Sequence, residues 1–168
     1  AGRCPGPSPS AVSASLDQLQ HYLGGLTAYL RNVGATVPEA TLDRYDSGEV
    51  GFELVASLPG PATPRPAEVR LGEIWGPSGE RFDRTEYLYD LVEYSRLRRR
   101  AFHSHDTEEF ARRFGVLVHE HCEETLGRPA CDHYFGLPVA TGYEALERLL
   151  AIWGQPDPLG CSRLRGIG

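Results

Sequence analysis

The stretch AEVRLGEIWGPSGERFDRTEYLYDLVEY, Ala67 to Tyr94, decides the predicted fold. Residues 67–75 and 81–94 are both rich in β-branched and aromatic side chains, which is typical of β-strands. The segment Gly76-Pro77-Ser78-Gly79 between them is predicted to be a turn. Two consecutive strands joined by a short turn pair in antiparallel fashion, so this stretch predicts a β-hairpin.

The flanking sequence extends this hairpin on both sides. Upstream, in EVGFELVASL, residues 49–58, Val50, Phe52 and Leu54 alternate with polar residues or glycine, which indicates a half-buried strand. The proline-rich segment 59–66 is predicted to be a loop, because proline cannot donate a backbone hydrogen bond. Downstream, RLRRRAFHSH is predicted to form a fourth strand, residues 96–105. Four successive strands with short connections favour an antiparallel meander.

Helical periodicity appears on both sides of these strands. Ser13 or Ser15 can cap a helix whose leucines recur at helical spacing, at Leu16, Leu19, Leu23, Leu26 and Leu30. A second helix is predicted from an N-cap at Asp106 or Thr107 to Gly127, and a third over 141–154. The fold class is therefore α+β: an N-terminal helix, a four-stranded antiparallel sheet and two C-terminal helices packed on one face.

Composition and charge limit the possible classes of protein. One domain is predicted over 13–154, between a Pro/Ser-rich disordered tail over 1–12 and a C-terminal tail over 155–168. A net charge of −6 argues against a general nucleic-acid-binding surface, although a local basic groove stays possible. No apolar run reaches the roughly 20 residues of a membrane span. Four cysteines without a CxxC pair predict reduced thiols, and so we expect a soluble, cytoplasmic protein.

The fourth predicted strand and the residues after it, RLRRRAFHSHD, hold the main candidate site residues. Side chains alternate between the two faces of a strand, so His103 and His105 share one face and lie about 6 to 7 Å apart at their Cα atoms. Arg98, Arg100 and Phe102 share the other face. Two imidazoles at this spacing can flank one substrate atom or hold one metal ion.

Two further histidines are predicted to lie on the second helix. His119 and His121 are two residues apart, which on a helix is about 200 degrees, so we expect them to point to opposite sides. His121 follows the apolar stripe and is predicted to face the sheet, whereas His119 is predicted to lie on the polar face. The sequence thus predicts a core site built from His103, His105 and His121, with Glu124 or His133 as a possible further member.

Three functions fit these residues. The first is metal-free cleavage of a phosphodiester, with His103 and His105 as acid and base, Arg100 as phosphate clamp and Asp106 orienting an imidazole. The second is a zinc-dependent hydrolase, in which His103, His105 and His121 hold zinc and leave a fourth position for water. The third is a binding or regulatory domain without chemistry, whose histidines only pack and cap. Zinc is expected as a cofactor only for the hydrolase, and the other two functions require no cofactor.

The order of features over 67–106 resembles TumE-type toxins of bacterial toxin–antitoxin modules. The resemblance rests on an acidic strand, a strand with spaced tyrosines and an arginine strand leading to histidines, here at Glu73, Tyr87, Tyr89, Arg100, His103 and His105. The asparagine–proline–double-histidine stretch of that family stands here as AFHSHD. The resemblance implies an intracellular protein that acts on RNA, has a cognate antitoxin partner and uses Tyr89 among its site residues. We therefore prefer toxin-type action on RNA, and we expect no membrane partner.

Overall fold

The computed structural model describes residues 12–59, 66–96, 98–104, 112, 118–123 and 133–153. Their elements follow in chain order as strands (β), α-helices and one short 3-10 helix (η). They are β1 Ser13–Ala14, α1 Leu16–Asn32, β2 Asp43–Arg44, β3 Val50–Leu58, β4 Ala67–Ser78, β5 Arg81–Glu93, η1 Tyr94–Arg96, β6 Arg98–Ser104, β7 Val118–Glu123, β8 His133–Phe135 and α3 Gly142–Trp153. The predicted α+β class is confirmed.

The strands form one antiparallel sheet in the order β2-β3-β4-β5-β6-β7-β8, and β1 pairs with β5 outside this path. The four predicted strands are confirmed as β3 to β6, and each pairs with the next one along the chain. The sheet is wider than predicted, because β2 pairs beside β3, and β7 and β8 continue it beyond β6. Sequence reasoning therefore found the centre of the sheet and missed its two sides.

Helix α1 begins where its sequence predicts. Ser15 is the N-cap and forms a capping box with Gln18, in which each side chain bonds the backbone N–H of the other residue. The buried face of α1 is formed by leucines four and three residues apart, namely Leu19, Leu23, Leu26 and Leu30. These leucines pack against β3 to β5, so burial of this apolar stripe holds the helix on the sheet.

The predicted second helix is wrong over Val118–Glu123, which is strand β7. Val, His and Cys are weak helix formers, so the sequence VHEHCE has little intrinsic preference for a helix. Backbone pairing with β6 along Arg99–Ser104 satisfies this segment as a strand instead. The rest of the predicted helix, apart from Arg112, lies outside the described residues. Arg112 is helical, and within the described part of the chain one C-terminal helix, α3, is confirmed on the sheet.

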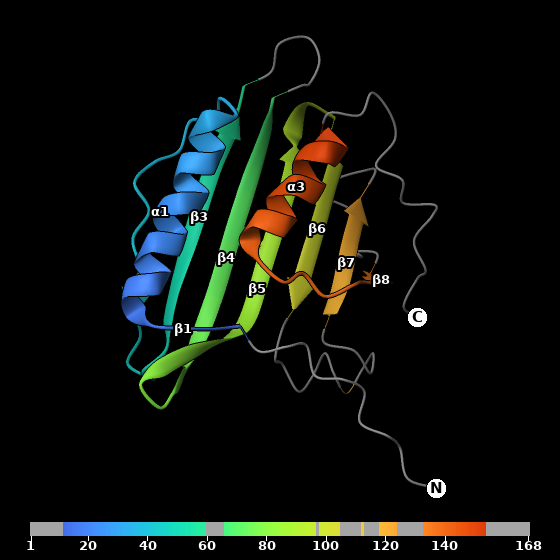
Figure 1. Ribbon diagram of the computed structural model, residues 1–168. Coiled ribbons are helices and arrows are strands. Elements are labelled where there is room, and N and C mark those ends of the chain that lie inside the picture. Colours follow the sequence, from blue (N-terminus) through green and yellow to red (C-terminus); the bar gives the residue numbers. More distant parts are fainter. Residues whose placement is uncertain are drawn as a thin grey trace, which may run out of the picture.

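The two helices cover the same face of the sheet, with α1 over β3 and α3 over β5 and β6 (Figure 1). The main core lies between this face and the helices and includes Leu54, Leu71, Tyr89, Phe102 and Leu149. The register places His103 beside Leu88 and His119, on the face that α1 and α3 do not cover. Neither α1 nor α3 therefore lies over His103, and the second helix that was predicted to face this site lies outside the described residues except at Arg112 and in β7.

Two further predictions concern compartment. Within the described part of the chain, no helix is long and apolar enough to cross a membrane. Cys122 in β7 is disulfide-bonded, which differs from the reduced thiols that we expected, and the other three cysteines lie outside the described residues.

Candidate metal centre

Three histidines from two adjacent strands meet on one face of the sheet. His103 lies on β6, and its cross-strand partner on β7 is His119. His121 lies two residues further along β7, and residues two apart on a strand project to the same face. The strand therefore brings together the two histidines that a helix would have pointed apart, and the predicted polar position of His119 is wrong.

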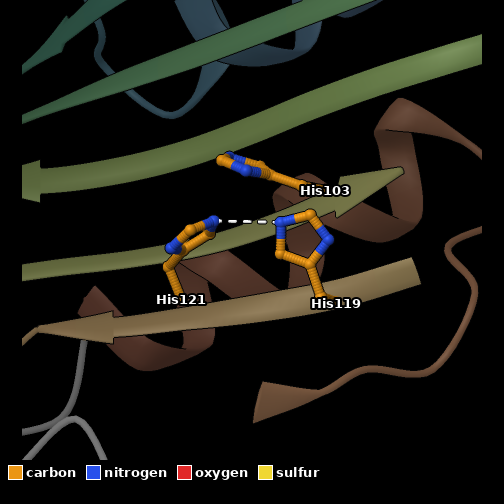
Figure 2. Close-up of side chains that lie close together, drawn as sticks. All are labelled: His103, His119 and His121. Carbon is orange, nitrogen blue, oxygen red and sulfur yellow. Dashed lines mark hydrogen bonds between the residues drawn. The ribbon is translucent and has the colours of Figure 1, made fainter. Parts of the chain in front are cut away.

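The ring nitrogens of these residues are close enough for one metal ion. One nitrogen from each of His103, His119 and His121 lies within 4.8 Å of the others. The Nε2 atoms of His119 and His121 are 3.1 Å apart, and the ring of His103 lies above both (Figure 2). In a tetrahedral site with zinc–nitrogen bonds of about 2.0–2.1 Å, neighbouring nitrogens are about 3.3 Å apart. One pair of nitrogens thus has about the spacing of zinc ligands, and the third would have to move closer to both.

All three imidazoles are buried. The exposed fractions are 3% for His103, 1% for His119 and 5% for His121. The ring centroids are 4.5 to 5.4 Å apart, so the three rings pack on one another. Burial of three polar rings in contact costs desolvation free energy. A metal ion or a shared set of hydrogen bonds would offset that cost.

A carboxylate from the neighbouring strand contacts the cluster. Asp90 on β5 lies with Oδ1 2.6 Å from Nε2 of His103, and its Oδ2 accepts a hydrogen bond of 2.9 Å from Arg99. Arg99 also donates to Glu123 at 3.2 Å, so its guanidinium joins β5 to β7 across β6. Burial alone would raise the pKa of Asp90, but the hydrogen bond and charge of His103 and the charge of Arg99 outweigh it, and the pKa is lowered. Asp90 is therefore held as a carboxylate.

A pocket of about 410 Å³ lies on the same face, one strand away from His103. Leu88 and Asp90, which are the cross-strand neighbour and the hydrogen-bond partner of His103, form part of its wall. Apolar residues form part of the lining, and among its charged side chains the carboxylates of Asp43, Glu53, Glu86 and Asp90 outnumber the one guanidinium, that of Arg70. The described lining therefore favours a neutral or cationic ligand over a polyanion.

Several of the other predicted site residues lie wholly or partly outside the described residues. His105, Asp106 and Glu124 lie outside the described residues. His133 lies in β8, paired in register with His121, but its side chain is also outside the described part. The predicted pair of His103 and His105, and the zinc site with His121, are therefore only partly visible.

Arg100 lies on the face opposite to His103, as the alternation along β6 predicts. Its guanidinium forms a buried ion pair with Glu120 and lies over the ring of Phe102, 5.5 Å from its centroid. The register pairs Phe102 with Glu120 and with Tyr89, all on the helix-covered face. Arg100 and His103 cannot approach the same phosphate oxygen while β6 lies between them.

Tyr89 is also on the helix-covered face, in a polar network around the buried carboxylate of Glu73. Its hydroxyl donates to Glu73 Oε1 at 2.6 Å, and Tyr22 donates to the same oxygen at 2.7 Å. Trp75 donates to Oε2 at 2.9 Å, and Arg84 lies 3.8 Å from Oε1. Burial raises the pKa of Glu73, whereas Arg84 and the three donors act in the opposite direction. This network ties α1 to β4 and β5.

Sequence reasoning missed His119 as a member of the site. The signal that could have found it is the HxH pattern of His119 and His121, which on a strand places both rings on one face. The decision between helix and strand for 118–123 depends on pairing with β6, which no local pattern contains.

The comparisons with known proteins found no match. No family model matches the chain, no curated protein matches it, and no solved structure matches it. The fold and the three-histidine cluster are thus described without an assigned family.

Proposed function

We propose that the protein is a zinc-dependent hydrolase whose metal is held by His103, His119 and His121. The observation that carries the proposal is the approach of three buried imidazoles to within 4.8 Å of one another. Among the described residues, three imidazoles from two adjacent strands are the side chains that could ligate this ion. Three protein ligands with one open position are the arrangement of catalytic zinc sites, whereas structural zinc sites have four.

The ligand set and the surrounding charge suit zinc. Imidazole nitrogens are ligands for zinc, copper, iron and nickel, whereas calcium and magnesium prefer oxygen ligands. Among the described residues beside the cluster, the two carboxylates of Asp90 and Glu123 and the one guanidinium of Arg99 give a net charge of −1. A divalent cation is attracted to a net negative environment in a buried place, where charges are weakly screened.

The chemistry that zinc would supply is the activation of water, because a bound water loses its proton near neutral pH. The residues of this chain would hold the ion and exclude bulk water around it. The pocket next to Asp90 and Leu88 gives room for a substrate on the same face. Its carboxylates support a neutral or cationic substrate, because a polyanion would meet like charges there.

Toxin-type action on RNA, with a cognate antitoxin and a location in the cytoplasm, stays a prediction from the sequence. The separation of Arg100 from His103 by strand β6 removes one support for it. The acidic pocket beside His103 removes another. For these two reasons the hydrolase is placed first here.

The proposal is tested with protein purified without a histidine tag, incubated with zinc and passed through a desalting column. We expect about one equivalent of zinc in the wild type and none in His119→Ala. The matched control is His21→Ala, because the His21 side chain on α1 is 79% exposed and should not affect the metal content. Hydrolysis of 4-nitrophenyl acetate should require zinc, stop with a chelator and be absent in His119→Ala.

The outcomes separate metal binding from catalysis. Wild type that retains no zinc would refute the proposal altogether. Wild type that retains zinc but hydrolyses the ester no faster than His119→Ala would refute the hydrolase and leave a structural metal site.

A further inference from the structure

We propose that Asp90 is a positioning residue that fixes the proton of His103 on Nε2, so that Nδ1 is the atom that binds the ion. This inference rests on the proposed metal centre and specifies how one of its ligands is set. Among the described residues, the ligand atoms would then be Nδ1 of His103 and Nε2 of His119 and His121. No pattern in the sequence assigns a role to Asp90.

The hydrogen bond between Asp90 and His103 determines the tautomer. Oδ1 of Asp90 lies 2.6 Å from Nε2 of His103, and both side chains are mostly buried. An ionised carboxylate only accepts hydrogen bonds, so the proton of this bond belongs to Nε2. An imidazole that ligates a metal is neutral and has a single N–H, so with that proton on Nε2 the lone pair for the metal is on Nδ1.

The strand register explains why Asp90 can reach this ring. Asp90 on β5 is paired with Ala101 on β6, and His103 lies two residues further along β6 on the same face. Diagonal neighbours of this kind on adjacent strands are within reach of long side chains. The side chain of Asp90 therefore contacts the far side of the His103 ring, away from β7 and its two histidines.

A second contact holds Asp90 in place. Its Oδ2 accepts from Nη2 of Arg99 at 2.9 Å, and Nη1 of Arg99 donates to Glu123 Oε1 at 3.2 Å. The exposed fractions of these three side chains are low, at 15% for Asp90, 18% for Arg99 and 10% for Glu123. Because both oxygens of Asp90 are engaged, the carboxylate cannot rotate away from His103 without breaking the bond to Arg99.

The arrangement has a defined effect on the metal. A carboxylate that accepts the second N–H of a ligating imidazole orients the ring and raises its basicity, and loss of such a partner typically lowers metal affinity 10- to 100-fold. Asp90→Ala should therefore weaken zinc binding by about this factor. Asp90→Asn keeps an acceptor oxygen but loses the charge, so its affinity should fall between those of wild type and Asp90→Ala.

The test combines zinc affinity with a direct measurement of the tautomer. Zinc dissociation constants are measured by competition with a chelating indicator for the wild type, Asp90→Asn, Asp90→Ala and the control Glu86→Gln. Glu86 lies on the same face of β5, four residues from Asp90, and among the described residues no hydrogen bond joins it to a histidine. Because Glu86 also lines the pocket assigned to the substrate, this control applies to the zinc dissociation constant alone and not to hydrolysis. Long-range ¹H–¹⁵N NMR of the His103 ring should show the proton on Nε2 in the wild type, with and without zinc, and a mixture of tautomers in metal-free Asp90→Ala.

The tautomer measurement distinguishes a positioning role from a merely structural one. Zinc bound normally by both Asp90 variants, or His103 protonated on Nδ1 in the wild type, would overturn the inference and leave the metal centre intact. Failure of the wild type to bind zinc would overturn the metal centre, whereas the metal-free spectrum would still test the bond to Asp90. If Asp90→Ala does not fold, Asp90→Asn and the wild-type spectrum decide the outcome.

Discussion

Replacement of Tyr89 by phenylalanine separates the two roles that this residue could have. Tyr89 is fully buried, and its hydroxyl donates to Glu73 at 2.6 Å and accepts from Arg84 at 2.8 Å. Tyr89→Phe removes both bonds while keeping the ring, which stacks on Tyr87 at a centroid distance of 4.9 Å. The carboxylate of Glu73 then loses one of its donors in a place that water does not reach.

The expected cost follows from the charge of the groups involved. A hydrogen bond to a charged group contributes about 1.5–3 kcal/mol to stability, and the cost of leaving a buried charged group with fewer partners falls in the same range. We therefore expect Tyr89→Phe to lower the free energy of unfolding by about 2 kcal/mol. For a domain of this size, that corresponds to a fall in Tm of roughly 4–8 °C. Zinc affinity should not change, because Tyr89 and the histidines lie on opposite faces of the sheet.

Tyr94→Phe is the matched control. Its hydroxyl also lies between a glutamate and an arginine, donating to Glu68 at 3.2 Å and accepting from Arg70 at 3.3 Å, but Tyr94 is 50% exposed. Water replaces these bonds, so the change should be within about 0.5 kcal/mol. Urea unfolding followed by fluorescence or circular dichroism measures both variants. An equal loss of stability in the two variants, or loss of zinc in Tyr89→Phe alone, would refute the reasoning.

Three further predictions concern α1, Asp90 and Cys122. Gly24→Ala should raise the free energy of unfolding by about 0.5–1 kcal/mol, because the added methyl group meets nothing within 4 Å. Gly25→Ala should lower the free energy of unfolding, because its methyl group would overlap the hydroxyl of Tyr143. Urea unfolding measures both variants, and the opposite order of stability would contradict this prediction. Since the pKa of Asp90 is lowered from its ordinary 3.8, its contribution to stability is present above pH 3.8 and is lost as pH falls through the folded-state value. The difference in unfolding free energy between wild type and Asp90→Asn should shrink in that window, and a constant difference would argue against it. A disulfide at Cys122 uses two of the four cysteines, so a thiol reagent should find two thiols at most in unfolded, unreduced protein, and four would show that the bond is absent.

Local patterns predicted the elements whose stability is local or repeated along the chain. The leucine spacing and the Ser15 cap predicted α1, and both are properties of one helical segment. Strands β3 to β6 were found because each pairs with the next along the chain, so a period of two and a short turn identify both the strand and its neighbour. The α+β class follows from these elements.

The candidate site depends on decisions that the sequence leaves open. The sequence identified His103 and His121 as candidates, and it placed Arg100 on the face opposite to His103. It could not join His119 to them, because the segment 118–123 becomes a strand only through backbone hydrogen bonds to β6, from which residues 105–117 separate it without a short turn between the two strands. Asp90 carried no signal either, since it meets His103 only through the register between β5 and β6. Residue identity thus determined which side chains could bind a metal, and long-range pairing of strands decided which of them meet, because hydrogen bonds between distant backbone segments have no signature in either segment alone.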